Sequence, residues 1–372
     1  MLRAIEAEPR LRLRLIASGT HLAAQFGSTL EAIERDGFVV SDRIEMLLAA
    51  DSPVGLAKSM GLGTLSFADS YARDRPDVLL VTGDRFEMHA AVVAALPFNI
   101  PIAHLHGGEV TAGAIDDALR HSITKFSHLH FTATADAQAR VIQLGEEPWR
   151  VTVSGAPSLD NVLALPRLDA SALANRLGMA LTPPPLLATF HPVTLQHERT
   201  ASHIDEVLAA LDAAGLPVIF TLPNADTSGH IIRERLARYV ADHANARIAD
   251  NLGSQAYFSL MNIAAAMVGN SSSGIIEAAS FGLPVVNVGD RQAGRMQARN
   301  VLDAAPERRA ILAAIRRACT PAFRSSLLGL VNPYGRGNAG VLIAERLRDV
   351  ELGETLLIKR FHDLPYQTAR YA

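Results

Sequence analysis

The sequence is poor in cysteine, in long apolar runs and in any excess of one charge. Its single cysteine, Cys319, excludes an intramolecular disulfide and a metal site built from several cysteines, which predicts a reducing, cytoplasmic setting. No run of about 18 apolar residues is free of charges and turn residues, so no membrane span is expected. Residues 1–21 carry glutamate and arginine throughout, which argues against a signal peptide. Because 35 basic and 38 acidic residues leave a net charge of -3, nucleic acid is not an expected partner.

What the sequence does have is length and a regular alternation of patterns. Its 372 residues, 49% of them hydrophobic, are enough for two domains with separate cores. Short apolar, β-branched runs alternate with helical patterns, which predicts buried parallel strands in doubly wound sheets. The runs expected to be strands form two series: Leu11–Ala17, Val78–Val81, Ile102–His106, Leu129–Ala133 and Val151–Val153, then Leu186–Phe190, Val218–Thr221, Arg247–Ala249, Ala266–Val268 and Val285–Val288.

A proline-rich segment, Thr182-Pro-Pro-Pro185, separates the two series and cannot continue a helix. We therefore expect a first domain at 1–165, a second at 166–350, and a tail at 351–372 that packs back on the first. The chain begins with a helix-like pattern, Leu2–Glu8, whereas a doubly wound domain usually begins with a strand and a glycine-containing turn. This predicts that a strand is missing ahead of Met1.

Polar side chains follow two strands of the first series. Asp84, Arg85 and Glu87 come directly after Val78–Val81 and precede a helical pattern. This is the carboxyl end of a strand, where open α/β sheets bind ligands, although Asp84 would also serve as an ordinary helix N-cap.

The second group of polar residues comprises His104, His106, Glu109, Asp116, Asp117, Arg120 and His121. Asp116 and Asp117 begin a helical pattern, so they are either caps and helix-dipole partners or an acid/base pair in which one carboxyl group is desolvated and protonated. His104 and His106 point to the same side of a strand, but no third ligand stands at a metal-site spacing, and no metal is expected.

Two motifs of the second series could bind a ligand. His191, in Thr189-Phe-His-Pro-Val193, is expected in a cleft between the domains, with a satisfied structural histidine as the alternative. The segment Gly269-Asn-Ser-Ser-Ser-Gly-Ile-Ile-Glu277 predicts a strand, a polar turn and a helix start. Its hydroxyls and free backbone N–H groups form a cradle for a diphosphate, and Glu277 could accept ribose hydroxyls. An ordinary capped turn is the alternative.

Six motifs, taken in order, cover nearly the whole chain: GDRFE, HLHGGE, IDDALRHSITKFSHLHF, FHPVT, GNSSSGIIEAASFGLPVVNVGDRQAGR and NPYGRGNAG. They resemble the hydrolysing UDP-N-acetylglucosamine 2-epimerases of sialic and legionaminic acid synthesis. The resemblance implies the GT-B fold, in which two Rossmann-like, doubly wound domains flank a cleft and the second holds UDP. It also implies no cofactor, a homodimer or homotetramer, and anti-elimination of UDP to a glycal followed by addition of water.

The resemblance further assigns roles residue by residue. The implied catalytic residues are Asp84, Glu109, Asp116, Asp117 and His191, and the implied substrate-binding residues are Arg85, His106, Arg120, Ser271, Ser272, Ser273, Gly274, Glu277 and Arg295. Many relatives have glutamate where this chain has His106, so the base stays open among Glu109, Asp116 and Asp117. Relatives also begin with a strand and a Gly-Thr-Arg-type loop that this chain lacks, which predicts weaker phosphate binding.

The expected reaction converts UDP-N-acetylglucosamine and water to N-acetylmannosamine and UDP. The alternatives are the same reaction on UDP-2,4-diacetamido-trideoxyglucose of the legionaminic acid pathway, a non-hydrolysing epimerase, a GT-B glycosyltransferase and a non-catalytic nucleotide-sugar-binding protein. Two carboxylates beside a third at a strand end favour an epimerase over a glycosyltransferase.

Overall fold

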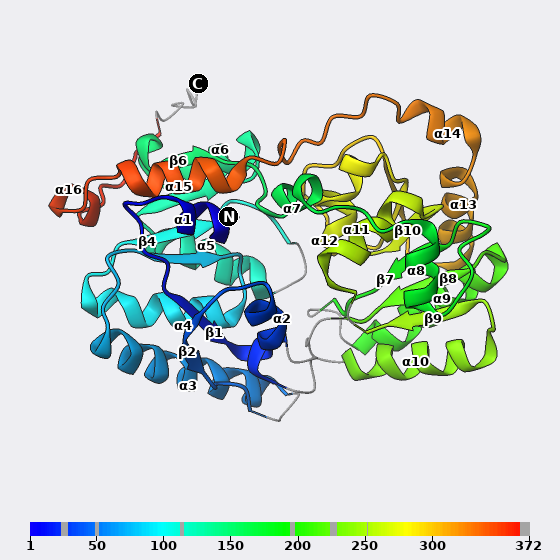
Figure 1. Ribbon diagram of the computed structural model, residues 1–372, viewed down its shortest axis with the longest axis horizontal. Coiled ribbons are helices and arrows are strands. Elements are labelled where there is room, and N and C mark those ends of the chain that lie inside the picture. The colour runs from blue at the N-terminus through cyan, green and yellow to red at the C-terminus, as the bar shows by residue number, and fades with distance from the viewer. Residues whose placement is uncertain are drawn as a thin grey trace, which may run out of the picture.

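The chain folds into two α/β halves that lie side by side (Figure 1). A computed structural model describes residues 1–23, 29–48, 52–111, 115–193, 198–223, 229–250 and 252–364. Every strand pairing in the described residues is parallel, and helices connect most successive strands. The expected GT-B arrangement of two Rossmann-like halves is therefore confirmed.

The first half contains a two-stranded sheet and a four-stranded sheet. In the smaller sheet β1 (Leu15–Ser18) pairs with β2 (Val40–Ile44). The larger sheet has the order β3-β4-β5-β6, with strands β3 (Leu79–Thr82), β4 (Ile102–Leu105), β5 (Leu129–Thr132) and β6 (Val151–Val153). Its helices are α1 (Leu2–Ala7), η1 (Gly19–Leu22), α2 (Thr29–Arg35), α3 (Pro53–Arg73), α4 (Phe86–Ala95), η3 (Leu96–Phe98), α5 (Ile115–Phe126), α6 (Ala135–Gln143) and η4 (Pro148–Arg150).

The second half is built on one six-stranded sheet of order β12-β11-β10-β7-β8-β9. The strands are β7 (Leu186–Thr189), β8 (Val218–Thr221), β9 (Ala246–Ala249), β10 (Ala266–Gly269), β11 (Val285–Val288) and β12 (Val301–Ala304). The remaining helices are α7 (Ser158–Ala164), α8 (Ala170–Leu177), α9 (Thr200–Ala214), α10 (Gly229–Asp242), α11 (Gly253–Ile263), α12 (Ser272–Ile276), η6 (Ala278–Phe281), α13 (Arg308–Ala318), α14 (Pro321–Ser326), α15 (Ala339–Asp349) and α16 (Glu354–Leu357).

Every run that the sequence predicted to be a strand overlaps one, but two strands were not expected. These are β2 and β12, which contain charged residues and lie at sheet edges. An edge strand buries less of its surface than a central one, so its apolar pattern is weak in the sequence. The first strand also begins at Leu15 instead of Leu11, after Arg14, whose guanidinium forms an ion pair with Asp74.

Apolar side chains of the six-stranded sheet alternate between two cores. Leu187 and Met267 pack with α8 and α11 on one face, whereas Leu186 and Val268 pack with α9 and α13 on the other. Because the sheet is covered on both faces, its strands are apolar on both sides, which explains why they were recognisable as continuous apolar runs.

The end of the chain returns to the first half. Helix α15 lies against α1, and its Ile343 joins a buried cluster with Leu105 and Phe131 of the first sheet (Figure 1). The buried Arg150 then donates hydrogen bonds to the carbonyls of Thr355 and Leu356. The segment that packs back on the first half therefore begins near residue 339, whereas the sequence placed its start at 351. The limits 1–165, 166–350 and 351–372 stay predictions, and residues 365–372 lie outside the described part.

In the described ranges, no helix combines the length and the apolar character that crossing a membrane requires.

Candidate active site

Asp84 and His106 follow neighbouring strands and come together because those strands pair in parallel. Val81 of β3 is aligned with His104 of β4, so both strands end at the same edge of the sheet. His104 Nε2 donates to Gly83 O at 2.8 Å, which ties the two strand ends together. Burial of His104 lowers its pKa to about 3, so the ring is neutral and structural. No cluster of metal-ligating side chains is found among the residues that the structure describes.

The buried guanidinium of Arg120 is the centre of the first-half site. It contacts Asp84 Oδ2, and its Nη1 donates to Asp117 Oδ1 at 3.2 Å and to Glu109 O at 2.9 Å. Its Nη2 also donates to Thr111 Oγ1 at 2.7 Å. A charge that is only 1% exposed requires such partners, and one arginine fork can hold two carboxylates at once. Asp84 and Asp117 therefore meet on one side chain.

Asp84 is not the helix cap that its position allowed. Helix α4 has Arg85 at its N-cap position, and no side chain caps it. The Asp84 carboxylate turns instead to Arg120. This corrects the capping alternative, because the buried arginine offers a stronger, charge-assisted partner than a backbone N–H group.

Asp116 and Asp117 face different arginines. Both lie in the first turn of α5, where negative charge is favoured by the helix dipole. Asp116 Oδ1 lies 4.0 Å from Arg85 Nη1, whereas Asp117 accepts from Arg120 and from the backbone N–H of Thr111 at 2.8 Å. The two neighbouring carboxylates therefore contact separate arginines, Asp116 the partly exposed Arg85 and Asp117 the buried Arg120.

His106 and Glu109 form a close pair at the end of β4. His106 Nδ1 donates to Glu109 Oε1 at 2.6 Å, and Arg295 Nη2 lies 3.3 Å from Glu109 Oε2. Although burial opposes the shift, His106 and Arg295 hold the pKa of Glu109 at about 2. Burial likewise opposes protonation of His106, but the charge and hydrogen bond of Glu109 outweigh it and raise the pKa of the imidazole.

In the second half, His191 and the serine-rich turn are fixed to one another. His191 N donates to Asn270 Oδ1 at 2.7 Å, and Asn270 Nδ2 donates back to His191 O at 2.8 Å. Gly269 precedes this pair with φ +134°, and a Cβ built on it would lie 1.8 Å from Thr189 O. Only glycine allows β7 and β10 to approach this closely before the turn.

The turn then begins a short helix. Ser271 caps α12 by accepting from Ser273 N at 3.3 Å. Gly274 packs against Val285 of β11, where a Cβ would lie 2.9 Å from a valine methyl group. Burial raises the pKa of Glu277, while hydrogen bonds from Ser158 and Ser273 oppose the rise.

Arg295 joins the two halves. It follows β11, and its Nε donates to Val110 O at 3.0 Å while Nη2 lies 3.2 Å from Thr111 Oγ1. The same loop holds the serine-rich turn, because Gln292 Nε2 donates to Asn270 O at 2.8 Å. The carboxylates of the first half and the cradle of the second are thus linked by residues 292–295.

Sequence reasoning missed several residues of this network. Asn270 and Gln292 stand inside recognised motifs, so their motifs could have drawn attention to them. Thr111 follows the HLHGGE motif and carries no signal of its own. Its role depends on Arg120 and Arg295 reaching it from two distant segments.

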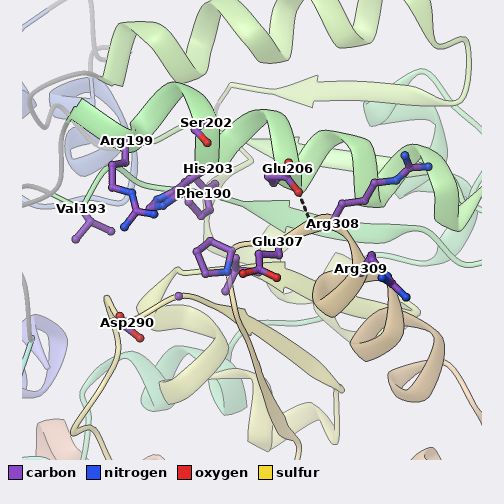
Figure 2. A pocket seen from close by; sticks show the side chains of 13 residues that line it. Phe190, Val193, Arg199, Ser202, His203, Glu206, Asp290, Glu307, Arg308 and Arg309 are labelled. Carbon is purple, nitrogen blue, oxygen red and sulfur yellow. Dashed lines mark hydrogen bonds between the residues drawn. The ribbon is translucent and has the colours of Figure 1, made fainter.

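A cavity of about 510 Å³ lies in the second half, next to the segment that carries His191 (Figure 2). Phe190 and Val193, which flank His191, form part of its wall, and Arg199 and Asp290 also line it. Glu206 accepts from the backbone N–H of Arg308 at 2.5 Å across it. All its lining residues belong to the second half, so it does not contain the carboxylate cluster.

Comparisons with known proteins agree with these motifs. The family model described as UDP-N-acetylglucosamine 2-epimerase matches residues 3–348. The chain is 42% identical over 301 residues to a GDP/UDP-N,N'-diacetylbacillosamine 2-epimerase (hydrolyzing) of Campylobacter jejuni, covering 80% of this chain and 78% of the relative. It is 36% identical over 360 residues to the UDP-N,N'-diacetylbacillosamine 2-epimerase (hydrolyzing) of Legionella pneumophila, covering 96% and 94%.

The fold is similar to that of a solved structure, the S. aureus MnaA-UDP co-structure. The TM-score is 0.78 at 15% sequence identity, over 93% of this chain and 91% of the other. At this identity the likeness concerns the fold.

Proposed function

The chain belongs to the UDP-N-acetylglucosamine 2-epimerase family and is a hydrolysing UDP-sugar 2-epimerase, and we propose that its substrate is a UDP-linked 2,4-diacetamido-2,4,6-trideoxy sugar. The products are UDP and the free sugar inverted at carbon 2. This choice replaces UDP-N-acetylglucosamine, which the sequence favoured, because the two relatives described above are named for the diacetamido sugar.

One observation carries the catalytic assignment: Arg120 holds Asp84 and Asp117 on a single guanidinium. Two anionic groups at one strand edge suit a transition state in which carbon 1 becomes positive. The carbon 2 proton is only weakly acidic, so the bond between carbon 1 and the UDP oxygen breaks before that proton is removed. Asp84 then stabilises the oxocarbenium-like state, and Asp117 takes the carbon 2 proton as general base.

The second half supplies the nucleotide site in this proposal. Ser271, Ser272, Ser273 and Gly274 surround the diphosphate at the start of α12, and His191 donates to it. Because the departing diphosphate gains negative charge, donors placed there lower the barrier. Glu277, held by Ser158 and Ser273, accepts the ribose hydroxyls. Arg85 and Asp116, which lie close to one another, line the part of the site that holds the sugar.

The resemblance also leads us to propose a homodimer or homotetramer in the cytoplasm, with a first domain near 1–165 and a second that begins near 166. Size-exclusion chromatography with light scattering measures the oligomer directly.

The function is tested by incubating the purified chain separately with UDP-2,4-diacetamido-2,4,6-trideoxyglucose and with UDP-N-acetylglucosamine. UDP release is followed over time, and NMR identifies the sugar. We expect a free, carbon-2-inverted sugar and a higher kcat/KM for the diacetamido substrate. A UDP-linked epimer would instead identify a non-hydrolysing enzyme. Absence of UDP release from both would contradict the proposed function.

A further inference from the structure

His106 has an unusual backbone conformation at the point where β4 ends. Its φ is +65°, in the left-handed region that residues other than glycine rarely adopt. The conformation is held by a hydrogen bond from His106 N to Phe131 O at 3.0 Å. Strained residues of this kind occur where the surroundings fix a side chain for function. Here the turn brings the His106 ring back onto Glu109.

Glu109 is enclosed, whereas His106 remains accessible. One carboxylate oxygen of Glu109 is taken by His106 Nδ1 and the other by Arg295, and the side chain is only 6% exposed. The His106 ring keeps 18% of its surface exposed. Since Nδ1 is used by Glu109, Nε2 is the nitrogen left for a ligand. A carboxylate that orients an imidazole in this way fixes which nitrogen faces the substrate.

The charges around His106 come from several elements. Glu109 and Asp84 favour its protonated form, and Arg295 opposes it. His104 of β4 and Glu277 of the second half also lie within electrostatic range. Glu109 is the strongest of the favourable partners because it contributes both charge and a hydrogen bond. The net result is an imidazole that holds its proton more tightly than a free histidine does.

We propose that His106 is the group that protonates carbon 2 of the glycal intermediate, and that Glu109 is its positioning residue and not the base. This inference rests on the proposed function. In the first stage the bond from carbon 1 to the UDP oxygen breaks and its electron pair leaves with UDP. Asp117 takes the carbon 2 proton, and the released electron pair forms the double bond between carbons 1 and 2.

In the second stage His106 Nε2–H gives its proton to carbon 2, which uses the electron pair of that double bond. Water oxygen bonds to carbon 1, and the proton that the water loses returns to Nε2. Asp117 releases its proton to solvent when the products leave, so the sum is substrate and water to free sugar, UDP and one proton. Arg295 of the second half contacts the other carboxylate oxygen of Glu109, so it acts on the pair only when the two halves are in contact.

The test compares wild type with His106→Gln, using UDP-2,4-diacetamido-2,4,6-trideoxyglucose as the probe and measuring UDP, glycal and free sugar separately. We expect the variant to release UDP and accumulate the glycal, with formation of inverted sugar reduced by about 100-fold or more. His243→Gln, at a partly exposed histidine that directly follows α10 and lies outside the candidate site, is the matched control and should behave as wild type. An inverted sugar formed at the wild-type rate, or loss of UDP release together with sugar formation, would overturn the proposal. If wild type itself released no UDP, the proposed function would fail instead.

A second variant tests the positioning role without removing the donor. Glu109→Gln keeps an oxygen that accepts from Nδ1 but loses the negative charge. The pH at which glycal hydration declines on the alkaline side should fall by about 1 to 3 units, because an opposite charge at this distance shifts a pKa by that amount. An unchanged pH profile would show that Glu109 does not act through His106.

Discussion

Arg295 Nη2 lies 3.3 Å from Glu109 Oε2, an ion pair between the loop that follows β11 and the loop that follows β4. Both side chains are almost fully buried, so the pair needs its other contacts to offset the loss of water. His106 supplies one, and the carbonyl of Val110 supplies another. The two halves are therefore held together at the candidate site itself, by the loops that follow β4 and β11.

Replacing Asp117 with asparagine should abolish most UDP release. The amide oxygen can still accept from Thr111 N, which preserves the local fold, but it cannot take a proton from carbon 2. We expect kcat to fall by about 100-fold to 10,000-fold, the range for loss of a general base. The measurement is coupled UDP release at saturating substrate. Glu351→Gln, an exposed acidic residue, is the control, and a variant as fast as wild type would remove Asp117 from the mechanism.

Replacing Glu277 with glutamine should weaken UDP binding while leaving the fold intact. A hydrogen bond to a charged group contributes about 1.5–3 kcal/mol, so the Kd for UDP should rise by roughly 10-fold to 150-fold. Isothermal titration calorimetry with UDP alone, without the attached sugar, measures this Kd. Glu345→Gln on α15 is a control of the same chemistry outside the site. Equal affinity in Glu277→Gln and wild type would contradict a ribose contact.

Replacing Gly269 with alanine should destabilise the second half. At φ +134° the added Cβ would meet Thr189 O at 1.8 Å, so β7 and β10 would have to separate. Backbone strain alone should lower the free energy of unfolding by about 1–3 kcal/mol, and the contact adds to it. Gly61→Ala is the matched control, because a Cβ there meets nothing within 4 Å and lies inside α3. Urea unfolding of both variants measures the difference in the free energy of unfolding. A Gly269→Ala protein as stable as the wild type would refute the packing argument.

The buried carboxylate of Glu146 should make the free energy of unfolding depend on pH in the acid range. Burial raises its pKa, but hydrogen bonds from His130, Lys125 and Lys359 prevail and lower it from 4.5 to about 2. A carboxyl group with a depressed pKa stabilises the fold above its unfolded value and loses that contribution as pH falls. The free energy of unfolding should therefore decline between pH 4.5 and about 2.

In Glu146→Gln the decline over that pH range should be smaller, because the titrating group is gone. The starting stability should also be lower, since two lysines lose their shared carboxylate partner. Denaturant unfolding at several pH values measures both effects. Parallel pH curves for wild type and variant would be the contrary result.

Much of the fold could be read from the sequence. The ten apolar runs predicted as strands all overlap strands, because central parallel strands are buried on both faces and must be apolar throughout. The ends of these runs also located Asp84, His106, His191 and Ser271, since the carboxyl ends of parallel strands share one edge. The edge strands β2 and β12 were missed for the opposite reason: partial exposure allows charged residues such as Asp42 and Asp303.

Local sequence is enough to specify the strand series, the glycine and serine turn after β10 and the family to which the motifs belong, because each is encoded within a short stretch of chain. Which side chains meet depends on the three-dimensional packing of distant segments. Arg120 could have paired with any nearby acid, and Arg295 contacts Val110 across a separation of 185 residues. Such partners are chosen by strand order and by the docking of one half on the other, and no local pattern carries that information.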